Sequence, residues 1–202
     1  MGLTRSPRLR VVACFAVVIA VGGSIGTSAA LASTTIAVPA AQETAIATGI
    51  QYNANEKLAI KASGEAFYGE IGGNRELYKS EYCFKQESSK ELAEGRPEAT
   101  WEIFSKPEGE KVAKPQTSGY RKCTEKTPYY EEGTTLASAP VGALLVSIGL
   151  PGTASSSGWF EAGKKLAGTE PYSGELYLLY NDTLGQYENN SGEYSATVSV
   201  KH

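Results

Sequence analysis

The alternation of apolar and polar residues near the C-terminal end of the chain is the feature that most restricts its fold. Tyr194, Ala196, Val198 and Val200 alternate with small polar residues, and this period of two places one face of a β-strand against a core. Other short strand-like runs lie at 46–52, 58–62, 99–105, 141–148, 158–162 and 175–180. Gly- and Pro-containing segments separate them, and little of the chain has a helical period. The pattern predicts an all-β protein, an antiparallel β-sandwich.

The segments between these runs carry further expectations. The runs 46–52 and 58–62 flank Asn53-Ala54-Asn55-Glu56, which is typical of a β-hairpin. Residues 33–42 are small and low in charge, so we expect a mobile leader there. Residues 164–171 are mostly polar, and we expect a connection without secondary structure.

Residues 1–32 have the composition of a secretory signal peptide. Arg5, Arg8 and Arg10 precede a short apolar run over 11–21, and small residues before Ser33 form a cleavage site. The apolar run is too short for a membrane span. We therefore expect a secreted, extracellular protein whose part 33–202 forms a single domain. Loss of the three arginines would change the formal net charge from −3 to −6, which argues against nucleic acid as a partner.

The use of cysteine agrees with export. Cys14 lies in the expected signal peptide, so Cys83 and Cys123 remain as a pair, and in an oxidising compartment such a pair is expected to form a disulfide. The only histidine is His202, so a metal site built on the two cysteines would lack partners. The bridge would lie within about 70–138, a segment dense in Glu and Lys and interrupted by Pro.

The stretch from Tyr180 to Tyr194 is unusual because it holds Asp182, the only aspartate among 22 acidic residues. Asn181, Asn189 and Asn190 lie in the same Gly-containing stretch. Short carboxylate and amide oxygens that converge in a loop suit Ca²⁺. The same residue types also form ordinary turns, so the residues alone leave both a cation site and a simple turn open. The loop joins the last two predicted strands at one end of the sandwich, where binding loops normally cluster.

Three stretches of the chain resemble motifs of a known family and follow one another in the same order as in that family. They read T-G-I-Q-Y-N-A-N-E-K-L-A-I at 48–60 with A-F-Y-G at 66–69, V-G-A-L-L-V-S-I-G at 141–149, and Y-N-D-T-L-G-Q-Y-E-N-N-S-G-E-Y at 180–194. The third is the most specific, and together they bracket nearly all of 33–202. The chain resembles the PA-I galactophilic lectins (LecA-like), which are calcium-dependent galactose-binding sandwiches of the jelly-roll type.

The resemblance implies a calcium site and a sugar site residue by residue. The implied calcium ligands are two backbone carbonyls and three side chains: Tyr68 and Gln186, then Asp182, Asn189 and Asn190. Two adjacent sugar hydroxyls would complete the shell, since Ca²⁺ accepts about six to eight oxygens. Thr183 would lie beside the sugar with its amide and hydroxyl. The implied ligand is a galactose-like or other vicinal-diol sugar, and because family lectins form multivalent oligomers, a homo-oligomer is possible.

The departures from the family pattern concern the sugar. The family also uses a His and a Gln from the loop before the second motif, and residues 127–140 contain neither. Tyr129 or Tyr130 could stack on a sugar face instead, and Glu131 or Glu132 could accept its hydroxyls. Glu188 adds a charge beside the cation. The disulfide-stapled segment at about 70–138 is an insertion that the family lacks.

Two functions remain open. One is a secreted calcium-dependent lectin, and the other is a non-catalytic structural or protein-interaction sandwich in which calcium only stabilises the loop. We do not expect an enzyme. A single terminal His excludes nucleophile–His arrangements, Glu131 and Glu132 are adjacent rather than flanking a cleft, and no glycine-rich phosphate loop is present.

Overall fold

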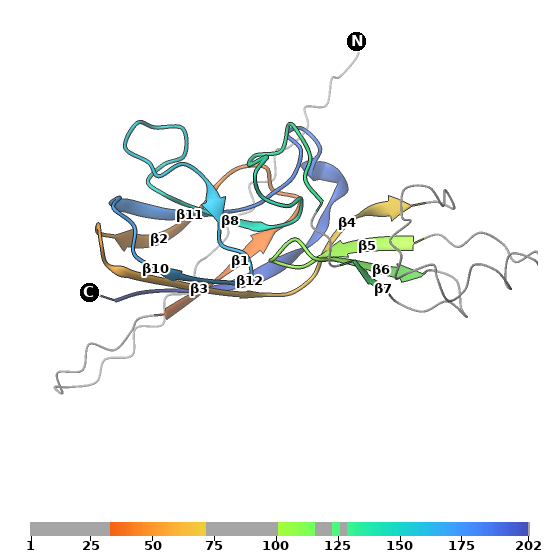
Figure 1. The fold of residues 1–202 in the computed structure, drawn as a ribbon, viewed down its shortest axis with the longest axis horizontal. Helices are drawn as coiled ribbons and strands as arrows, with labels where there is room; N and C mark the ends of the chain where they lie inside the picture. Colours follow the sequence, from red (N-terminus) through yellow and green to blue (C-terminus); the bar gives the residue numbers. More distant parts are fainter. Residues whose placement is uncertain (1–32, 72–100, 116–122, 126–128, 202) are drawn as a thin grey trace, which may run out of the picture. The chain divides into compact units, whose positions relative to one another are not determined.

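The computed structural model describes residues 33–71, 101–115, 123–125 and 129–201. These ranges form two antiparallel β-sheets (Figure 1), and their only helical element is the 3-10 turn η1, Tyr187–Asn189. The predicted all-β antiparallel sandwich is therefore confirmed. None of the described helical structure is long and apolar enough to cross a membrane. The expected signal peptide, 1–32, lies outside the described residues.

The larger sheet is organised around the last strand, β12. Its strands run in the order β10-β3-β12-β4-β5-β6-β7, and β1 pairs with β12 as well. Their bounds are β1 Ser33–Pro39, β3 Lys57–Ser63, β4 Ala66–Ile71, β5 Trp101–Ser105, β6 Lys111–Pro115, β7 Cys123–Glu125, β10 Lys165–Gly168 and β12 Ser191–Lys201. β12 has β1 on one side and β3 on the other, and its first two residues pair with β4.

The smaller sheet covers one face of the larger one. Its strands run in the order β2-β11-β8-β9, with bounds β2 Ile46–Tyr52, β8 Leu144–Ile148, β9 Phe160–Glu161 and β11 Gly174–Tyr180. All five residues of β8 are buried, as its continuous apolar run requires. The predicted inward face of β12 is confirmed, because Tyr194, Ala196, Val198 and Val200 are all in the core.

Three expectations about the connections were wrong. Strands β2 and β3 do not form a hairpin, since β2 pairs with β11 and β3 pairs with β10 and β12. The turn between them is closed locally: Asn53 donates its backbone N–H to Glu56 Oε2 at 3.0 Å, and Glu56 returns an N–H to the Asn53 carbonyl at 3.1 Å. The two middle residues bond outside the turn, since Ala54 donates its N–H to Ser173 Oγ and Asn55 donates its N–H to the Glu170 carbonyl, each at 2.8 Å. The turn therefore passes the chain from the smaller sheet to the larger one.

The other two errors concern strands with little apolar sequence. Residues 33–39 are no mobile leader but pair along β12 as strand β1, with Val38 buried. Residues 165–168 form strand β10 rather than an irregular connection, and Leu166 packs against the core. Each is held by the backbone groups of a neighbouring strand and by few inward apolar side chains, Ile36 and Val38 in β1 and Leu166 in β10, which composition alone does not reveal.

The described part of the predicted insertion extends the larger sheet. Strands β4, β5, β6 and β7 follow one another as antiparallel neighbours, and the strand expected at 99–105 is confirmed as β5. Ser105 fastens this extension to the sandwich, because its hydroxyl lies 2.7 Å from that of Tyr180 and accepts a hydrogen bond of 2.9 Å from Tyr194. Cys83 lies outside the described residues, so its bridge to Cys123 stays a prediction.

Candidate functional site

The loop from 181 to 190 carries the chain from β11 in the smaller sheet to β12 in the larger one. Asn181 fixes where it begins. Its side-chain Nδ2 donates to the backbone carbonyls of Leu136, Ala139 and Pro140 at 3.0–3.1 Å, and its Oδ1 accepts from Leu136 N–H at 3.0 Å. This fully buried side chain therefore joins the 181–190 loop to the 136–140 turn. The sequence reading treated it only as a polar residue of the loop.

Asp182 is held from both sides of its carboxylate. Oδ1 accepts the Thr183 N–H at 2.7 Å, and Oδ2 accepts a hydrogen bond of 2.5 Å from Asn190 Nδ2. The residue is only 3% exposed. Burial raises the pKa of Asp182, and the charge of Glu131 adds to this, while the two hydrogen bonds and Lys111 oppose the rise. The hydrogen bonds and Lys111 do not fully offset the effect of burial, so a bound cation would stabilise the ionised form of Asp182.

Tyr187 supports the backbone beneath this carboxylate. Its hydroxyl donates to the Tyr180 carbonyl at 2.9 Å, accepts the Asp182 N–H at 3.1 Å and lies 2.8 Å from the Thr135 hydroxyl. The ring is buried. Sequence reasoning missed this residue, because the spacing from Asp182 to an aromatic five positions later predicts no contact unless the 3-10 turn is known.

Asn190 holds an oxygen that suits a cation. Its Nδ2 makes both of its available bonds, to Asp182 Oδ2 and to the Ala40 carbonyl at 3.3 Å. Its Oδ1 is buried and has no hydrogen-bond partner. Buried polar atoms are rarely left unsatisfied, and an amide oxygen beside a carboxylate is a normal calcium ligand. Asp182 and Asn190 therefore fit the predicted ion.

The remaining predicted calcium ligands lie around this pair. Tyr68 is the extra residue of a β-bulge, because the β4–β5 register shifts between Phe67 and Gly69. Phe67 pairs with Ser191, which puts Tyr68 level with Asn190. Bulges of this kind often lie next to functional sites.

Gln186 and Asn189 belong to the same loop. Both side chains are exposed, and the Gln186 carbonyl accepts the Asn189 N–H at 3.5 Å. Nowhere in the described ranges do three or more His, Cys, Asp or Glu side chains gather as a metal site. A calcium site here would therefore depend on one carboxylate, with amide and carbonyl oxygens supplying the rest.

Lys111 is a charged neighbour of the site that the sequence did not indicate. It is 3% exposed, its Nζ has no hydrogen-bond partner, and this atom lies 3.5 Å from the centroid of the Tyr68 ring. Burial lowers the pKa of Lys111 to about 7, although the charges of Asp182 and Glu131 act in the opposite direction. It comes from β6 of the insertion, so its approach to the loop depends on strand pairing that no local pattern shows.

The predicted sugar-contacting residues lie on two segments that the structure joins. Leu184 donates its N–H to the Gly133 carbonyl at 3.1 Å, and Thr134 forms a β-bridge with Thr183. Tyr129 and Tyr130, four and three residues before Gly133, are 49% and 52% exposed. The tyrosines thus precede, by a few residues, the part of their segment that pairs with the 181–190 loop, and their rings are open to solvent.

Comparisons with known proteins give one family match and one structural neighbour. The sequence model of the family described as PA-IL-like protein matches residues 115–202. Among solved structures, the EclA N-terminal domain, titled a PllA-like lectin, superposes with a TM-score of 0.45 and 18% identity, covering 83% of this chain and 95% of that one. No curated protein matches the chain. The matched residues 115–202 hold the motifs at 141–149 and 180–194, so the family that these motifs resemble is also the one whose model matches this part of the chain.

Proposed function

We propose that this protein is a calcium-dependent carbohydrate-binding protein, in which Ca²⁺ joins the 181–190 loop to two adjacent hydroxyls of a sugar. The observation that carries the proposal is the pairing of Asp182 with Asn190, which leaves Asn190 Oδ1 buried and without a partner beside the only aspartate of the chain. Ca²⁺ is the cation that this donor set favours, because every proposed ligand is an oxygen and Ca²⁺ accepts carboxylate, amide and carbonyl oxygens in flexible geometry.

The nature of the sugar follows from what surrounds the ion. Thr183 is half-buried next to Asp182, and the exposed rings of Tyr129 and Tyr130 are on the adjacent segment. Exposed aromatic rings commonly pack on the apolar face of a sugar. A galactose-like or other vicinal-diol sugar is the ligand class we propose, with binding and no catalysis. We also propose that the protein acts outside the cell, which rests on the composition of residues 1–32.

A second candidate function has one observation in its favour. Asp182 and Asn190 are 3% and 5% exposed, and ligands so deeply placed suit an ion that only stabilises the loop. In this alternative the protein is a structural or protein-interaction sandwich, and calcium contributes to folding through its binding free energy.

Calorimetric titration of calcium and then of monosaccharides into chelator-stripped protein separates these functions. Asp182→Asn tests the site, and Glu188→Gln is the matched control because it removes one exposed negative charge from the same loop. We expect calcium binding by the wild type and by Glu188→Gln, none by Asp182→Asn, and sugar heats that vanish with chelator. Calcium binding without any sugar response would favour the stabilising role. Equal calcium binding by Asp182→Asn would overturn the site itself.

A further inference from the structure

The outward face of the larger sheet carries a cluster of lysines far along β12 from the 181–190 loop. Lys57 on β3 pairs directly with Lys201 on β12, and Lys61 on β3 pairs directly with Lys165 on β10. Directly paired residues of neighbouring strands point to the same side of a sheet. All four side chains are exposed. We call these four residues the lysine face.

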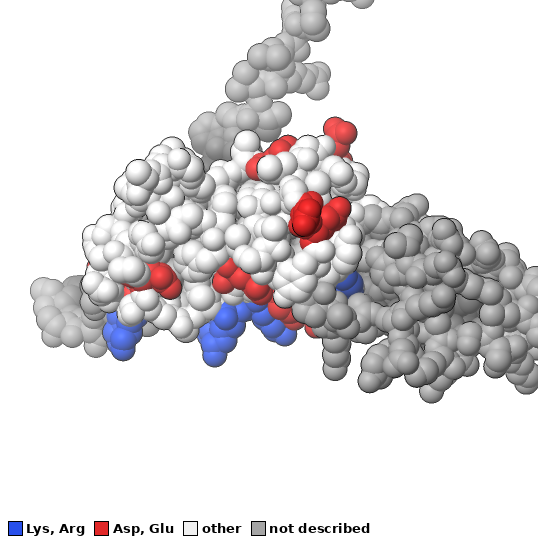
Figure 2. Space-filling view, turned by 45° about the horizontal axis from the view of Figure 1, so that its top comes forward, with Lys and Arg blue, Asp and Glu red and all other residues white. Residues whose placement is uncertain are grey.

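Such an arrangement is unfavourable unless something compensates it. Like charges directly opposite each other across strands destabilise a sheet, and the chain as a whole has a formal net charge of −3. The ion pairs found among the described residues use other lysines, Lys106, Lys114 and Lys164, and none of the lysine face. In Figure 2 most of the visible Lys and Arg side chains gather along the lower margin of the molecule.

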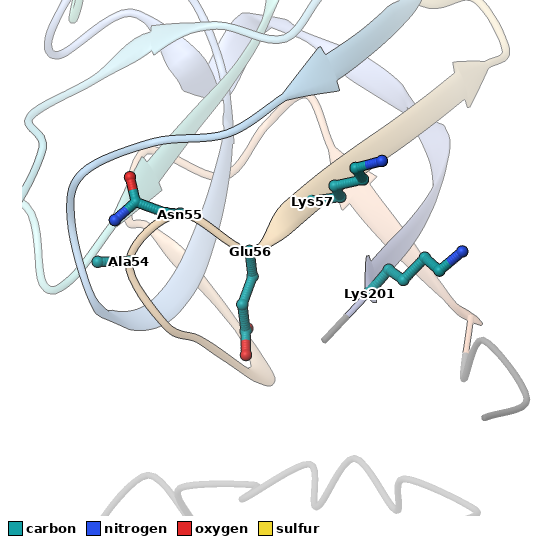
Figure 3. Close-up of a pocket in the computed structure, with 5 residues that line it drawn as sticks. All are labelled: Ala54, Asn55, Glu56, Lys57 and Lys201. Carbon is teal, nitrogen blue, oxygen red and sulfur yellow. The ribbon is translucent and has the colours of Figure 1, made fainter.

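The space beside Lys57 and Lys201 is open to a ligand. An open pocket of about 410 Å³ is lined by Ala54, Asn55, Glu56, Lys57 and Lys201. In Figure 3 the two lysine side chains extend in the same direction, and the Glu56 side chain points away from them. The Glu56 carboxylate accepts hydrogen bonds from the backbone N–H and Nδ2 of Asn53 at 3.0 and 2.8 Å, so it is engaged within its own turn.

The outward surface between the two lysine pairs bears small side chains. Ala59, Ala167 and Ser199 occupy the outward positions between them. The two pairs are about 13 Å apart along β3, from four residues at about 3.3 Å each. A linear ligand with repeated negative charges could therefore contact both pairs while lying close to the sheet.

From this geometry we infer that the lysine face binds an anionic polysaccharide. A second copy of the chain would bring like charges together and is disfavoured. Single-stranded nucleic acid normally stacks on aromatic rings, and no outward position of β3, β10 or β12 is aromatic. A polysaccharide bearing sulfate or phosphate groups needs only the spaced cations that this face provides.

The test is binding to heparin, a sulfated polysaccharide, at 50 mM NaCl with chelator present, so that the calcium site takes no part. The variant is Lys57→Gln/Lys201→Gln, and the matched control is Lys106→Gln/Lys114→Gln, which removes the same charge from lysines that are ion-paired elsewhere. We expect wild-type binding that weakens with added salt, about tenfold weaker binding by the variant, and a change of less than about twofold in the control. A fourfold variant that also carries Lys61→Gln and Lys165→Gln should not bind.

Three results would overturn the inference. They are no heparin binding by the wild type, equal losses in the two double variants, or tighter binding to single-stranded DNA or to phosphatidylserine vesicles than to heparin. The thermal unfolding midpoint of each variant checks that it is folded. Because chelator is present throughout, these results are independent of calcium-dependent sugar binding.

Discussion

Asn190 donates a 2.5 Å hydrogen bond from its side-chain amide to Oδ2 of Asp182, across the turn that η1 makes between them. This bond fixes the orientation of the Asn190 amide, since the other hydrogen of Nδ2 goes to the Ala40 carbonyl. Oδ1 is therefore directed away from both acceptors. One short bond thus positions the carboxylate and the amide oxygen as a pair, before any ion is present.

Calcium affinity should fall with pH because a proton competes for Asp182. Burial raises the pKa of this carboxyl, and Glu131 contributes in the same direction while Lys111 opposes it. Calcium needs the ionised form, so we expect affinity to drop by up to about tenfold for each pH unit below that raised pKa. Calorimetry from pH 7 down to pH 3.8, the ordinary pKa of this group, measures this. An affinity independent of pH over that range would contradict the assignment of Asp182 as a ligand.

Protonation of Asp182 should weaken calcium binding but should stabilise the fold of the metal-free protein. A raised pKa means that the folded chain binds the proton more tightly than the unfolded chain, whose value is near 3.8. The contribution of Asp182 to the free energy of unfolding therefore increases as the pH falls through the raised pKa toward 3.8. Urea unfolding with chelator should show this increase in the wild type and not in Asp182→Asn.

Replacing Lys111 by Met should stabilise the protein at pH 7 and tighten calcium binding. The folded-state pKa of Lys111 is about 7 and its ordinary value is 10.5, so wild-type stability should rise as the pH increases from 7 toward 10.5. Between pH 7 and pH 9 we expect a gain of about 1–2 kcal/mol that the variant lacks. Calcium binding should strengthen because a competing positive charge beside Asp182 is removed.

Urea unfolding at the two pH values and calcium calorimetry check this prediction, with Lys114→Met as the control. Lys114 is paired with Glu65 at 2.6 Å and is partly exposed, so its loss should not reproduce the pH effect. If the free energy of unfolding depended on pH in the same way in the wild type and in Lys111→Met, the prediction would be wrong, because the buried charge of Lys111 would then not destabilise the fold.

Gly142→Ala should destabilise the fold much more than Gly152→Ala. Both glycines have φ of +83°, so the backbone strain of a side chain is the same. A Cβ at Gly142 would lie 2.4 Å from Ser105 Cβ, whereas at Gly152 nothing lies within 4 Å. We expect about 1 kcal/mol for Gly152→Ala and about 3 kcal/mol or more for Gly142→Ala. Similar losses in chemical denaturation would mean that the insertion moves easily away from the sandwich at Ser105.

Tyr187→Phe should weaken both the loop and its calcium affinity. The change removes the acceptor of the buried Asp182 N–H and the donor to the Tyr180 carbonyl, which predicts a loss of about 1–3 kcal/mol. Tyr130→Phe, whose ring is 52% exposed, is the control for loss of a hydroxyl and should change stability little. Denaturation and calcium titration of the two variants decide between a supporting role for Tyr187 and mere space filling.

The sequence predicted the strands whose apolar side chains alternate clearly. It missed the strands that are held mainly by backbone hydrogen bonds to a neighbouring strand. The inward face of β12 follows from the alternation at 194–200, because one buried sheet face dictates it. Strand β1 was missed because two inward apolar residues, Ile36 and Val38, are too few to show a clear period, and the strand is stabilised by the backbone groups of β12. The predicted hairpin at 46–62 was wrong because a tight turn can join strands of two different sheets as readily as two neighbouring strands of one sheet.

The residues of the candidate site also fall into these two groups, those that a local motif predicts and those that only the tertiary structure brings together. Asp182 and Asn190 lie eight residues apart in one distinctive motif, so their meeting could be predicted locally. Lys111 reaches the loop only through the β4–β5–β6 pairing, and Tyr187 contacts Asp182 only because of a 3-10 turn. Both depend on tertiary geometry that a single sequence does not encode in any short pattern.

The attachment of Asn190 to Ala40 has a consequence for biosynthesis. Ala40 accepts the Asn190 amide and donates its own N–H to the Gly192 carbonyl at 3.0 Å, so the geometry of the loop depends on a segment made 150 residues earlier. Contacts of such long sequence separation form late in folding. A chain that is still being synthesised has no β12 with which β1 can pair, so the proposed calcium site cannot yet form. Occupancy of this site would therefore report that a molecule has been both completed and folded.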